Sequence, residues 1–291
     1  MVITYRALLC ESTEALLNCS DTPRLDAEIL LSHLLGRERV WLAVHADDAA
    51  KEEICLQMRT LTARRANHEP IAYLVGAREF MGLPFRVRPG VLIPRPDTET
   101  LTEAVLKENT AEHPKIIDLC TGSGAIAVSL AHFIPGAAVA AVDFSEICVR
   151  TARENAEKNN VGARVHVVCA DFLHENFAEV FFRLLNSEEK ADILVSNPPY
   201  IRSSELSALM PDVRDYEPSS ALDGGEDGLI FYRRVAQLAP ALLRRGGLLA
   251  LEAGYDQADD IAELLDRNGF RGIRFALDLS GIRRVVLARR D

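Results

Sequence analysis

The 291-residue sequence has no long hydrophobic run and no recognisable export signal. No apolar stretch reaches the roughly 20 residues that a membrane-spanning helix needs. The first residues, MVITYRALLCESTEALL, include neither a basic leading segment nor a small-residue cleavage site. We therefore expect a cytoplasmic protein that does not associate with membranes.

Cysteine and histidine are present without the patterns of a disulfide framework or a metal site. There is no CxxC pair, the seven histidines are scattered, and the six cysteines stand at positions 10, 19, 55, 120, 148 and 169. Structural zinc sites and disulfide-rich folds need short, regular spacings. We expect reduced thiols and no metal ion.

Basic residues are scarce in the second part of the chain. Residues 1–90 hold 11 basic and 12 acidic residues, residues 91–291 hold 22 and 31, and residues 188–227 alone hold 3 and 10. Nucleic-acid binding needs several Lys or Arg contacts to phosphates, so we expect no nucleic-acid partner there. The acidic segment either keeps the surface soluble or steers a basic protein partner.

The first 75 residues follow a helical pattern. Apolar residues recur at helical spacing after Thr22-Pro23 up to Gly36, and again from about 48 to 66. This segment has no cluster of catalytic residue types, so we expect it to serve recognition or packing. Residues 76–90 then predict a β-hairpin linker, with short strands at 77–82 and 84–88.

A proline-containing run, Leu92–Glu99, follows the hairpin. Pro94 and Pro96 make it extended, and Asp97 or Thr98 can cap a helix of roughly 98–109. The run is either a structural loop or a segment that folds over a cofactor.

From Lys115 onward, strand and helix patterns alternate, which predicts an α/β fold with a doubly wound parallel sheet. A final pair of strands, close in sequence, should form an antiparallel edge. The expected strands are 116–119, 138–142, 165–168, 193–195, 248–251, 272–277 and 284–288, and the expected helices begin at 125 or span 145–160, 229–244 and 256–268.

The first of these strands runs into a glycine-rich turn, Asp118-Leu-Cys120-Thr121-Gly122-Ser123-Gly124, directly before a helix. Glycines allow a sharp turn close to a ligand, and the helix N-terminus offers free N–H groups. Position 127 is Ala, so a dinucleotide remains possible on this loop alone. Asp143 ends the second strand, where a carboxylate can accept hydrogen bonds from both hydroxyls of a ribose.

Asp171-Phe172 follows the third strand. An acid that accepts from an adenine amino group, beside an aromatic ring that lies on the base, would suit adenosine. Each residue alone is more often a strand-end cap or a core phenylalanine. Together with the glycine-rich loop and Asp143, they indicate an adenosine site.

The most informative stretch is Asn197-Pro198-Pro199-Tyr200, which follows the apolar strand Ile193–Val195. The two prolines remove two backbone donors, so the carbonyls of Asn197 and Pro198 have no adjacent N–H group to compete for a guest. Asn197 adds an acceptor and Tyr200 an aromatic face, which suits a planar NH2 group. The alternative is a stiff turn in which Tyr200 belongs to the core.

An adenosine site beside a socket for an amino nitrogen predicts S-adenosylmethionine as the methyl donor, with S-adenosylhomocysteine as the product. The sequence shows no evident general base next to the tip of this strand, residues 197–200. We therefore expect catalysis by Asn197, Pro198 and Tyr200 through alignment and through carbonyl oxygens that stabilise developing positive charge.

Nearly the whole chain resembles the release factor glutamine methyltransferases. The likeness rests on Pro70–Tyr73, Gly76, Phe80–Gly82, Phe85–Val87, Val91–Pro96, Thr98-Glu99, Asp118–Ala127, Asn197–Ile201, Glu217-Pro218, Ala221-Leu222, Gly224-Gly225, Asp227–Leu229, Asp278-Leu279, Gly281 and Arg284. The Asn-Pro-Pro-Tyr motif alone is shared with methyltransferases of adenine and cytosine amino groups. The proline-rich run joined to it is much more specific.

The resemblance implies a seven-stranded, Rossmann-like methyltransferase domain at 91–291, preceded by a helical domain at 1–75 that recruits the substrate. It implies methylation of the side-chain N5 of the glutamine in the Gly-Gly-Gln motif of class 1 peptide chain release factors. The cofactor would lie along residues 120–124, with Asp143 on the ribose and Phe172 on adenine. Residues 197–200 would hold the glutamine amide, and we expect a monomer.

Three positions depart from the family pattern: Cys120 replaces a frequent glycine, Asp97 a frequent glutamate, and Phe172 the tryptophan of some members. Because a helix N-terminus favours thiolate, Cys120 should be more reactive than the other five cysteines and be protected by cofactor. The alternative is an inert Cys120 that points into the sheet.

Other functions compete with this interpretation. A glutamine methyltransferase of a ribosomal protein would share the pocket, and a nucleic-acid amino methyltransferase is disfavoured by the acidic segment. An inactive scaffold with a methyltransferase fold is disfavoured by the intact Asn197, Tyr200 and Asp143.

Overall fold

The computed structural model describes residues 3–185 and 189–291, and the chain forms two compact units. The first unit, which we call the helical unit, consists of Met1–Ala77 together with Met210–Tyr216. The second, which we call the sheet unit, consists of Arg78–Leu209 and Glu217–Asp291. A seven-residue excursion from the middle of the chain therefore belongs to the helical unit.

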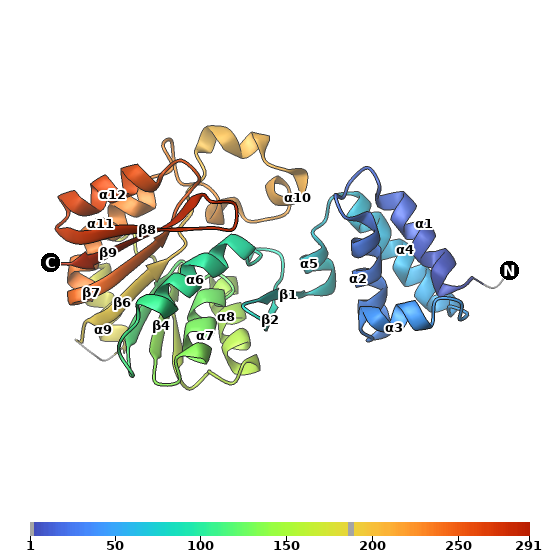
Figure 1. The fold of residues 1–291 in the computed structure, drawn as a ribbon, viewed down its shortest axis with the longest axis horizontal. Helices are drawn as coiled ribbons and strands as arrows, with labels where there is room; N and C mark the ends of the chain where they lie inside the picture. The colour runs from blue at the N-terminus through green and yellow to red at the C-terminus, as the bar shows by residue number, and fades with distance from the viewer. Residues whose placement is uncertain (1–2, 186–188) are drawn as a thin grey trace. The chain divides into compact units, whose positions relative to one another are not determined.

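The helical unit is built around buried leucines and a methionine from helices with apolar faces, including Leu8, Leu30 and Met58. Its helices are α1 (Tyr5–Leu16), α2 (Pro23–Leu35), α3 (Arg39–Val44), α4 (Glu52–Ala66), α5 (Ile71–Val75) and α10 (Pro211–Arg214) (Figure 1).

The predicted start of α2 at Pro23 and its end at Gly36, which has a φ of 60°, are confirmed. The prediction for α4 began four residues too early. Residues before it are held in an extended bridge to the chain start, where the Ala50 amide donates to the Ile3 carbonyl at 2.8 Å. This long-range pairing delays the helix until Glu52.

The predicted hairpin consists of β1 (Ala77–Phe80) and β2 (Leu83–Arg86), and all of it except Ala77 belongs to the sheet unit. A seven-stranded sheet follows in the order β5-β4-β3-β6-β7-β9-β8. Its strands are β3 (Lys115–Leu119), β4 (Ala138–Asp143), β5 (Val165–Cys169), β6 (Ala191–Ser196), β7 (Leu243–Glu252), β8 (Phe270–Leu277) and β9 (Arg283–Arg290). The first five are parallel and β9 runs antiparallel to β7 and β8, which confirms the doubly wound sheet with an antiparallel edge.

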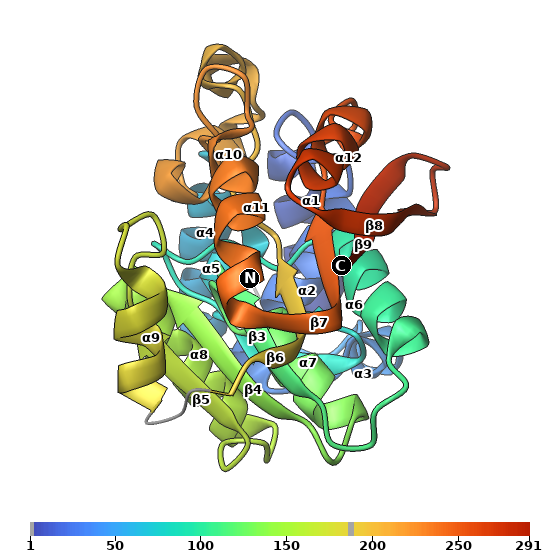
Figure 2. The same ribbon diagram turned by 90° about the vertical axis from the view of Figure 1, so that its left-hand side faces the viewer.

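Helices cover both faces of this sheet (Figures 1 and 2). One face packs on α6 (Pro96–Glu108), α7 (Ala125–Phe133) and α8 (Glu146–Lys158). The other packs on α9 (Phe177–Leu185), α11 (Ile230–Leu242) and α12 (Ala258–Arg267). Central strands that are buried on both faces explain the continuous apolar runs of the sequence.

Two details of the sheet unit differ from the predictions. Helix α6 begins at Pro96, with Arg95 as its N-cap and not Asp97 or Thr98, because proline suits the first position of a helix. Helix α9 and the 3-10 turns at Ser203–Ala208 and Ser219–Ala221 were not predicted, and neither was the short α10 of the helical unit.

The chain reverses its direction of winding at β3, which pairs with β4 on one side and with β6 on the other. Ligands of open α/β sheets bind at the carboxyl ends of the strands flanking this point. Leu119 of β3 lies opposite Ser196 of β6. The register therefore brings the glycine-rich turn beside Asn197.

Candidate functional site

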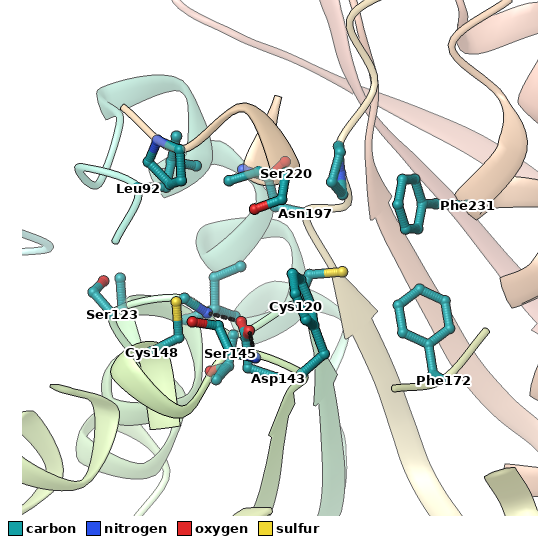
Figure 3. Close-up of a pocket in the computed structure, with 18 of the residues that line it drawn as sticks. Leu92, Cys120, Ser123, Asp143, Ser145, Cys148, Phe172, Asn197, Ser220 and Phe231 are labelled. Carbon is teal, nitrogen blue, oxygen red and sulfur yellow. Dashed lines mark hydrogen bonds between the residues drawn. The ribbon is translucent and has the colours of Figure 1, made fainter. Parts of the chain in front are cut away.

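A cavity of about 400 Å³ opens at the carboxyl ends of β3, β4, β5 and β6, a size typical of small-molecule sites. The predicted site residues among its lining are Cys120, Thr121, Gly122, Ser123, Asp143, Asp171, Phe172, Asn197 and Pro199. Gly124, Pro198 and Tyr200 are not among the described residues that line it, although each adjoins one that does. Figure 3 shows the cavity with Asp143 at its base.

The glycine-rich turn is tightly packed behind the cavity. Gly124 has a φ of 81°, and a Cβ atom there would come within 3.0 Å of the Cβ of Ala152 in α8. A side chain at 124 would therefore push α7 and α8 apart. Gly122 and Cys120 also have positive φ angles, of 55° and 61°, which explains why a glycine suits position 120.

Asp143 joins this turn to the start of α8. One carboxylate oxygen accepts a hydrogen bond from the Gly122 amide at 2.9 Å, and the other accepts from the Ser145 amide at 3.0 Å. Burial raises the pKa of Asp143, and these backbone donors oppose that rise. Because each carboxylate oxygen has two lone pairs, the bonds from Gly122 and Ser145 alone do not use up the acceptor capacity of Asp143.

Two phenylalanines form an aromatic wall of the cavity. The rings of Phe172 and Phe231 lie 5.9 Å apart with an interplanar angle of 48°, and Figure 3 shows both on the same side of the cavity. Asp171, also in the lining, accepts a hydrogen bond from the Leu173 amide at 2.9 Å. Phe231 was missed from the sequence, because its position in α11 reads as an ordinary apolar helix residue.

The tip at residues 197–200 is held from several sides. The Asn197 amide nitrogen donates to Thr98 Oγ1 at 3.1 Å. The Tyr200 carbonyl accepts from Gln257 Nε2 at 2.9 Å, while its hydroxyl donates to Glu252 Oε1 at 3.3 Å. The ring of Tyr200 packs against the core cluster on the α11 and α12 face. The tip is therefore fixed in place before any ligand arrives.

Glu252, at the end of β7, is a buried carboxyl group that hydrogen-bonds directly to this tip through the Tyr200 hydroxyl. It is 1% exposed, and its Oε2 has no hydrogen-bond partner among the described residues. Burial, the largest influence, raises its pKa to about 7, and the Thr98 hydroxyl, Arg284 and the Tyr200 hydroxyl oppose the rise. Glu252, which lies 52 residues beyond Tyr200, was not predicted as a site residue.

The proline-rich run borders the cavity through Leu92, Pro94, Arg95 and Thr98. Glu217 anchors this run. Its buried carboxylate accepts a hydrogen bond from the Ile93 amide at 3.0 Å and forms an ion pair with Arg95. Of the two alternatives for this run, its position along the cavity is compatible with a segment that folds over a cofactor. Glu217-Pro218 was among the residues that carry the family resemblance, but no role was predicted for it.

The prediction of a reactive Cys120 is wrong in its chemistry. Burial, together with the carboxylates of Asp143, Asp118 and Asp171, raises the pKa of the Cys120 thiol well above its ordinary value. These effects outweigh the nearby helix N-terminus, so the thiol stays protonated near neutral pH. Cys10 and Cys169 are exposed, which does not favour the expectation that Cys120 is more reactive than all five other cysteines.

Within the described part of the chain, no group of three or more His, Cys, Asp or Glu side chains is placed to hold a metal ion. None of the helices in residues 3–185 and 189–291 combines the length and apolar character needed to cross a bilayer.

Comparisons with known proteins identify relatives along nearly the whole chain. Residues 8–76 match the family described as PrmC N-terminal domain, and residues 95–211 match the methyltransferase small domain. The chain is 41% identical over 264 residues to the release factor glutamine methyltransferase of Clostridium acetobutylicum, covering 90% of each protein. It is 43% identical over 267 residues to that of Geobacter sulfurreducens, covering 91% of this chain and 89% of the relative.

Among solved structures, a methyltransferase from Pyrococcus furiosus shares the fold. The TM-score is 0.52 at 18% identity, and the match covers 78% of this chain and 98% of that one.

Proposed function

Because the chain belongs to the release factor glutamine methyltransferases, we propose that it methylates the side-chain N5 of the glutamine in the Gly-Gly-Gln motif of class 1 peptide chain release factors. The methyl donor is S-adenosylmethionine and the product is S-adenosylhomocysteine. The observation that carries the proposal is the contact between two sites: a cavity suited to an adenosine, and an acceptor-rich tip suited to a planar amide.

The cavity fits the cofactor by its chemistry. Asp143 has acceptor positions left for the ribose hydroxyls, Asp171 offers an acceptor for the adenine amino group, and Phe172 with Phe231 offers an apolar wall for the base. The tight turn at Gly122 and Gly124 brings backbone close to the ligand. When bound, S-adenosylmethionine supplies an electrophilic methyl group.

The tip positions the glutamine amide. Asn197 Nδ2 is engaged by Thr98, and no described residue donates to Asn197 Oδ1, so this oxygen remains to accept an N–H of the substrate. The Pro198 carbonyl is the second acceptor, since the prolines leave no adjacent donor. Acceptors aimed at the nitrogen stabilise the positive charge that develops on it, and they hold it in line with the methyl group.

A labelling experiment tests this function. The purified chain is incubated with radiolabelled S-adenosylmethionine and, separately, a class 1 release factor, the same factor with its Gly-Gly-Gln glutamine replaced by alanine, ribosomal proteins, and DNA. We expect label on the intact factor only, mapped by mass spectrometry to that glutamine. Equal labelling of the alanine variant, or preferential labelling of a ribosomal protein or DNA, would contradict the proposal.

We also propose that the helical unit recruits the release factor, because a single glutamine offers too little surface for a specific complex. A chain lacking residues 1–75 should still bind cofactor and methylate a short Gly-Gly-Gln peptide, but should modify the intact factor poorly. Wild-type efficiency on the intact factor would rule out recruitment by this unit.

The deletion also removes Asn67, whose carbonyl accepts the Tyr216 hydroxyl at 2.6 Å. Tyr216→Phe in the full-length chain is the matched control, because it loses this hydrogen bond and keeps the helices. It should retain wild-type activity on the intact factor.

A further inference from the structure

We propose that Asn155 is a positioning residue that joins the glycine-rich turn to the β1–β2 hairpin, so that cofactor binding in the cavity and order in the hairpin are coupled. The inference rests on the proposed function, because the coupling is to the S-adenosylmethionine or S-adenosylhomocysteine bound beside the turn. Asn155 is not among the described residues that line the cavity. It therefore acts on the ligand through the turn.

Asn155 is an unfavourable residue for its place in the chain. It lies inside α8 and is fully buried. Asparagine is a weak helix former, and a buried amide group costs free energy unless it finds hydrogen-bond partners. An apolar side chain would suit a buried helix position better on these grounds alone. The contacts that Asn155 makes outside α8 offset this cost.

All three of these contacts are to backbone groups. Oδ1 accepts a hydrogen bond from the Arg86 amide at 2.7 Å, and Nδ2 donates to the Arg86 carbonyl at 3.0 Å and to the Ser123 carbonyl at 2.8 Å. A backbone N–H can only donate, and a carbonyl can only accept. The direction of the Asn155 amide is therefore fixed by three partners whose roles cannot be reversed.

On the hairpin side, Asn155 takes the place of a neighbouring strand. Strand β2 pairs with β1 in a two-stranded sheet, and an isolated hairpin of this kind is at best marginally stable in water. The N–H and C=O groups of Arg86 both bond to the Asn155 amide, as they would to a residue of an adjacent strand. One helical turn later, Asn159 Nδ2 donates to the Pro84 carbonyl at 3.2 Å. Two asparagines of α8 thus hold the backbone of β2.

On the cavity side, Asn155 fixes a peptide group of the glycine-rich turn. The carbonyl of Ser123 bonds to Asn155, and the N–H of the same peptide group, that of Gly124, donates to the Thr121 carbonyl at 2.8 Å. Asp143 holds the amide of the residue before Ser123 at 2.9 Å. Ser123 lines the cavity (Figure 3). The wall that faces the ligand is therefore set by two side chains from outside the turn.

One side chain thus connects the ligand to the hairpin. A ligand that orders the turn keeps the Ser123 carbonyl on Asn155, and the same amide then stays on Arg86. Coupling of this kind is reciprocal, so loss of Asn155 should also weaken ligand binding. Without it, the Ser123 carbonyl loses a buried hydrogen bond, and only a fraction of the molecules would hold the turn in its binding-competent form.

Asn155→Ala and Asn159→Ala form a matched pair that tests the proposal. Both remove a buried amide of α8 that bonds to β2, but only Asn155 also bonds to the turn. Both variants should unfold more easily than wild type. Only Asn155→Ala should raise the Kd of S-adenosylhomocysteine, by roughly 5- to 20-fold, while kcat at saturating cofactor stays within about threefold. Equal dissociation constants in the two variants would overturn the proposal.

Asn155→Leu keeps the test decisive if the alanine variant does not fold. Leucine fills the space that alanine would leave to water, and it is a better helix former than asparagine. It removes the same three hydrogen bonds, so the Kd should rise as in Asn155→Ala. A wild-type Kd in Asn155→Leu would exclude a positioning role for Asn155.

Hydrogen exchange of the Arg86 amide, followed by NMR, measures the coupling itself. S-adenosylhomocysteine should slow this exchange by roughly 2- to 10-fold in wild type and in Asn159→Ala, and should leave it unchanged in Asn155→Leu. A merely structural role would not produce this pattern. No ligand effect in wild type, or the same effect in Asn155→Leu, would refute the coupling.

Alkylation of Cys120 gives a measurement that needs no cofactor. Cys120 belongs to the same turn and lines the cavity, so a loosened turn should be labelled faster in Asn155→Leu than in Asn159→Ala. If the wild type binds neither S-adenosylmethionine nor S-adenosylhomocysteine but this difference holds, the proposed function and the coupling fail and the positioning of the turn stands. If the wild type binds both ligands and the two variants are labelled alike, the positioning fails on its own.

Discussion

Asp143→Asn is the sharpest test of how the cavity holds its ligand. The substitution preserves shape but replaces one carboxylate oxygen with an NH2 group. Both oxygens now accept backbone N–H bonds, from Gly122 at 2.9 Å and Ser145 at 3.0 Å. Whichever way the new amide turns, one of these backbone donors meets another donor, and one acceptor position for the ribose is lost.

The expected magnitude follows from these contacts. A hydrogen bond to a charged acceptor contributes about 1.5–3 kcal/mol, which corresponds to roughly a 10- to 150-fold rise in Kd. The same loss should appear for S-adenosylmethionine and S-adenosylhomocysteine, because both carry the ribose. At saturating cofactor kcat should change little, since the bond is made equally in ground and transition states.

Isothermal titration calorimetry with both ligands measures the effect. Asp259→Asn serves as the control, because it removes an exposed carboxylate that pairs with Arg283 and is not among the described residues that line the cavity. Unchanged dissociation constants in Asp143→Asn would refute the ribose assignment. A change for one ligand only would do the same.

Three other predictions follow from the geometry. Asn197→Ala should lower the transfer rate about a hundredfold or more, a loss of about 3 kcal/mol, while calorimetry finds the cofactor Kd within a few-fold; near-normal turnover would end the amide-socket hypothesis. Timed alkylation followed by mass spectrometry should label exposed Cys10 and Cys169 before Cys120, with cofactor slowing Cys120 further, and early labelling of Cys120 would contradict its raised pKa. Burial raises the pKa of Asp118 to about 7, so the folded state keeps a proton that the unfolded state releases, and unfolding free energy should fall as pH rises from 5 to 8. Denaturant titrations should show Asp118→Asn gaining about 3 kcal/mol on wild type over that interval, and a constant difference would contradict the prediction.

Local patterns predicted the parts of the site that follow strands directly. Ile193–Val195 reads as a buried strand, so the position of Asn197 at its carboxyl end followed, as did that of Asp143. The alternation of strands and helices was enough for the doubly wound sheet. These features depend on neighbours in sequence or on a general rule of sheet topology.

Contacts between distant segments could not be predicted in this way. Glu252 reads as the end of an apolar strand, and nothing near it indicates a bond to Tyr200 or an approach to Thr98. The pKa of Cys120 could not be predicted for the same reason, because it depends on residues distant in sequence. A nearby helix N-terminus was visible in the sequence, but the burial and the carboxylates that dominate were not.

The return of Met210–Tyr216 to the helical unit has a consequence in time. Helices α1 to α5 are complete at Val75, whereas Tyr216, whose hydroxyl bonds to the Asn67 carbonyl, is added about 140 residues later. At about 5–20 residues per second, the ribosome needs roughly 7 to 30 seconds for that stretch. During this interval the nascent helices lack the segment that completes their unit, and β3, β4, β5 and β6 are all synthesised before it ends. The unit at the start of the chain is therefore finished after the strands that carry the glycine-rich turn and the Asn197 tip.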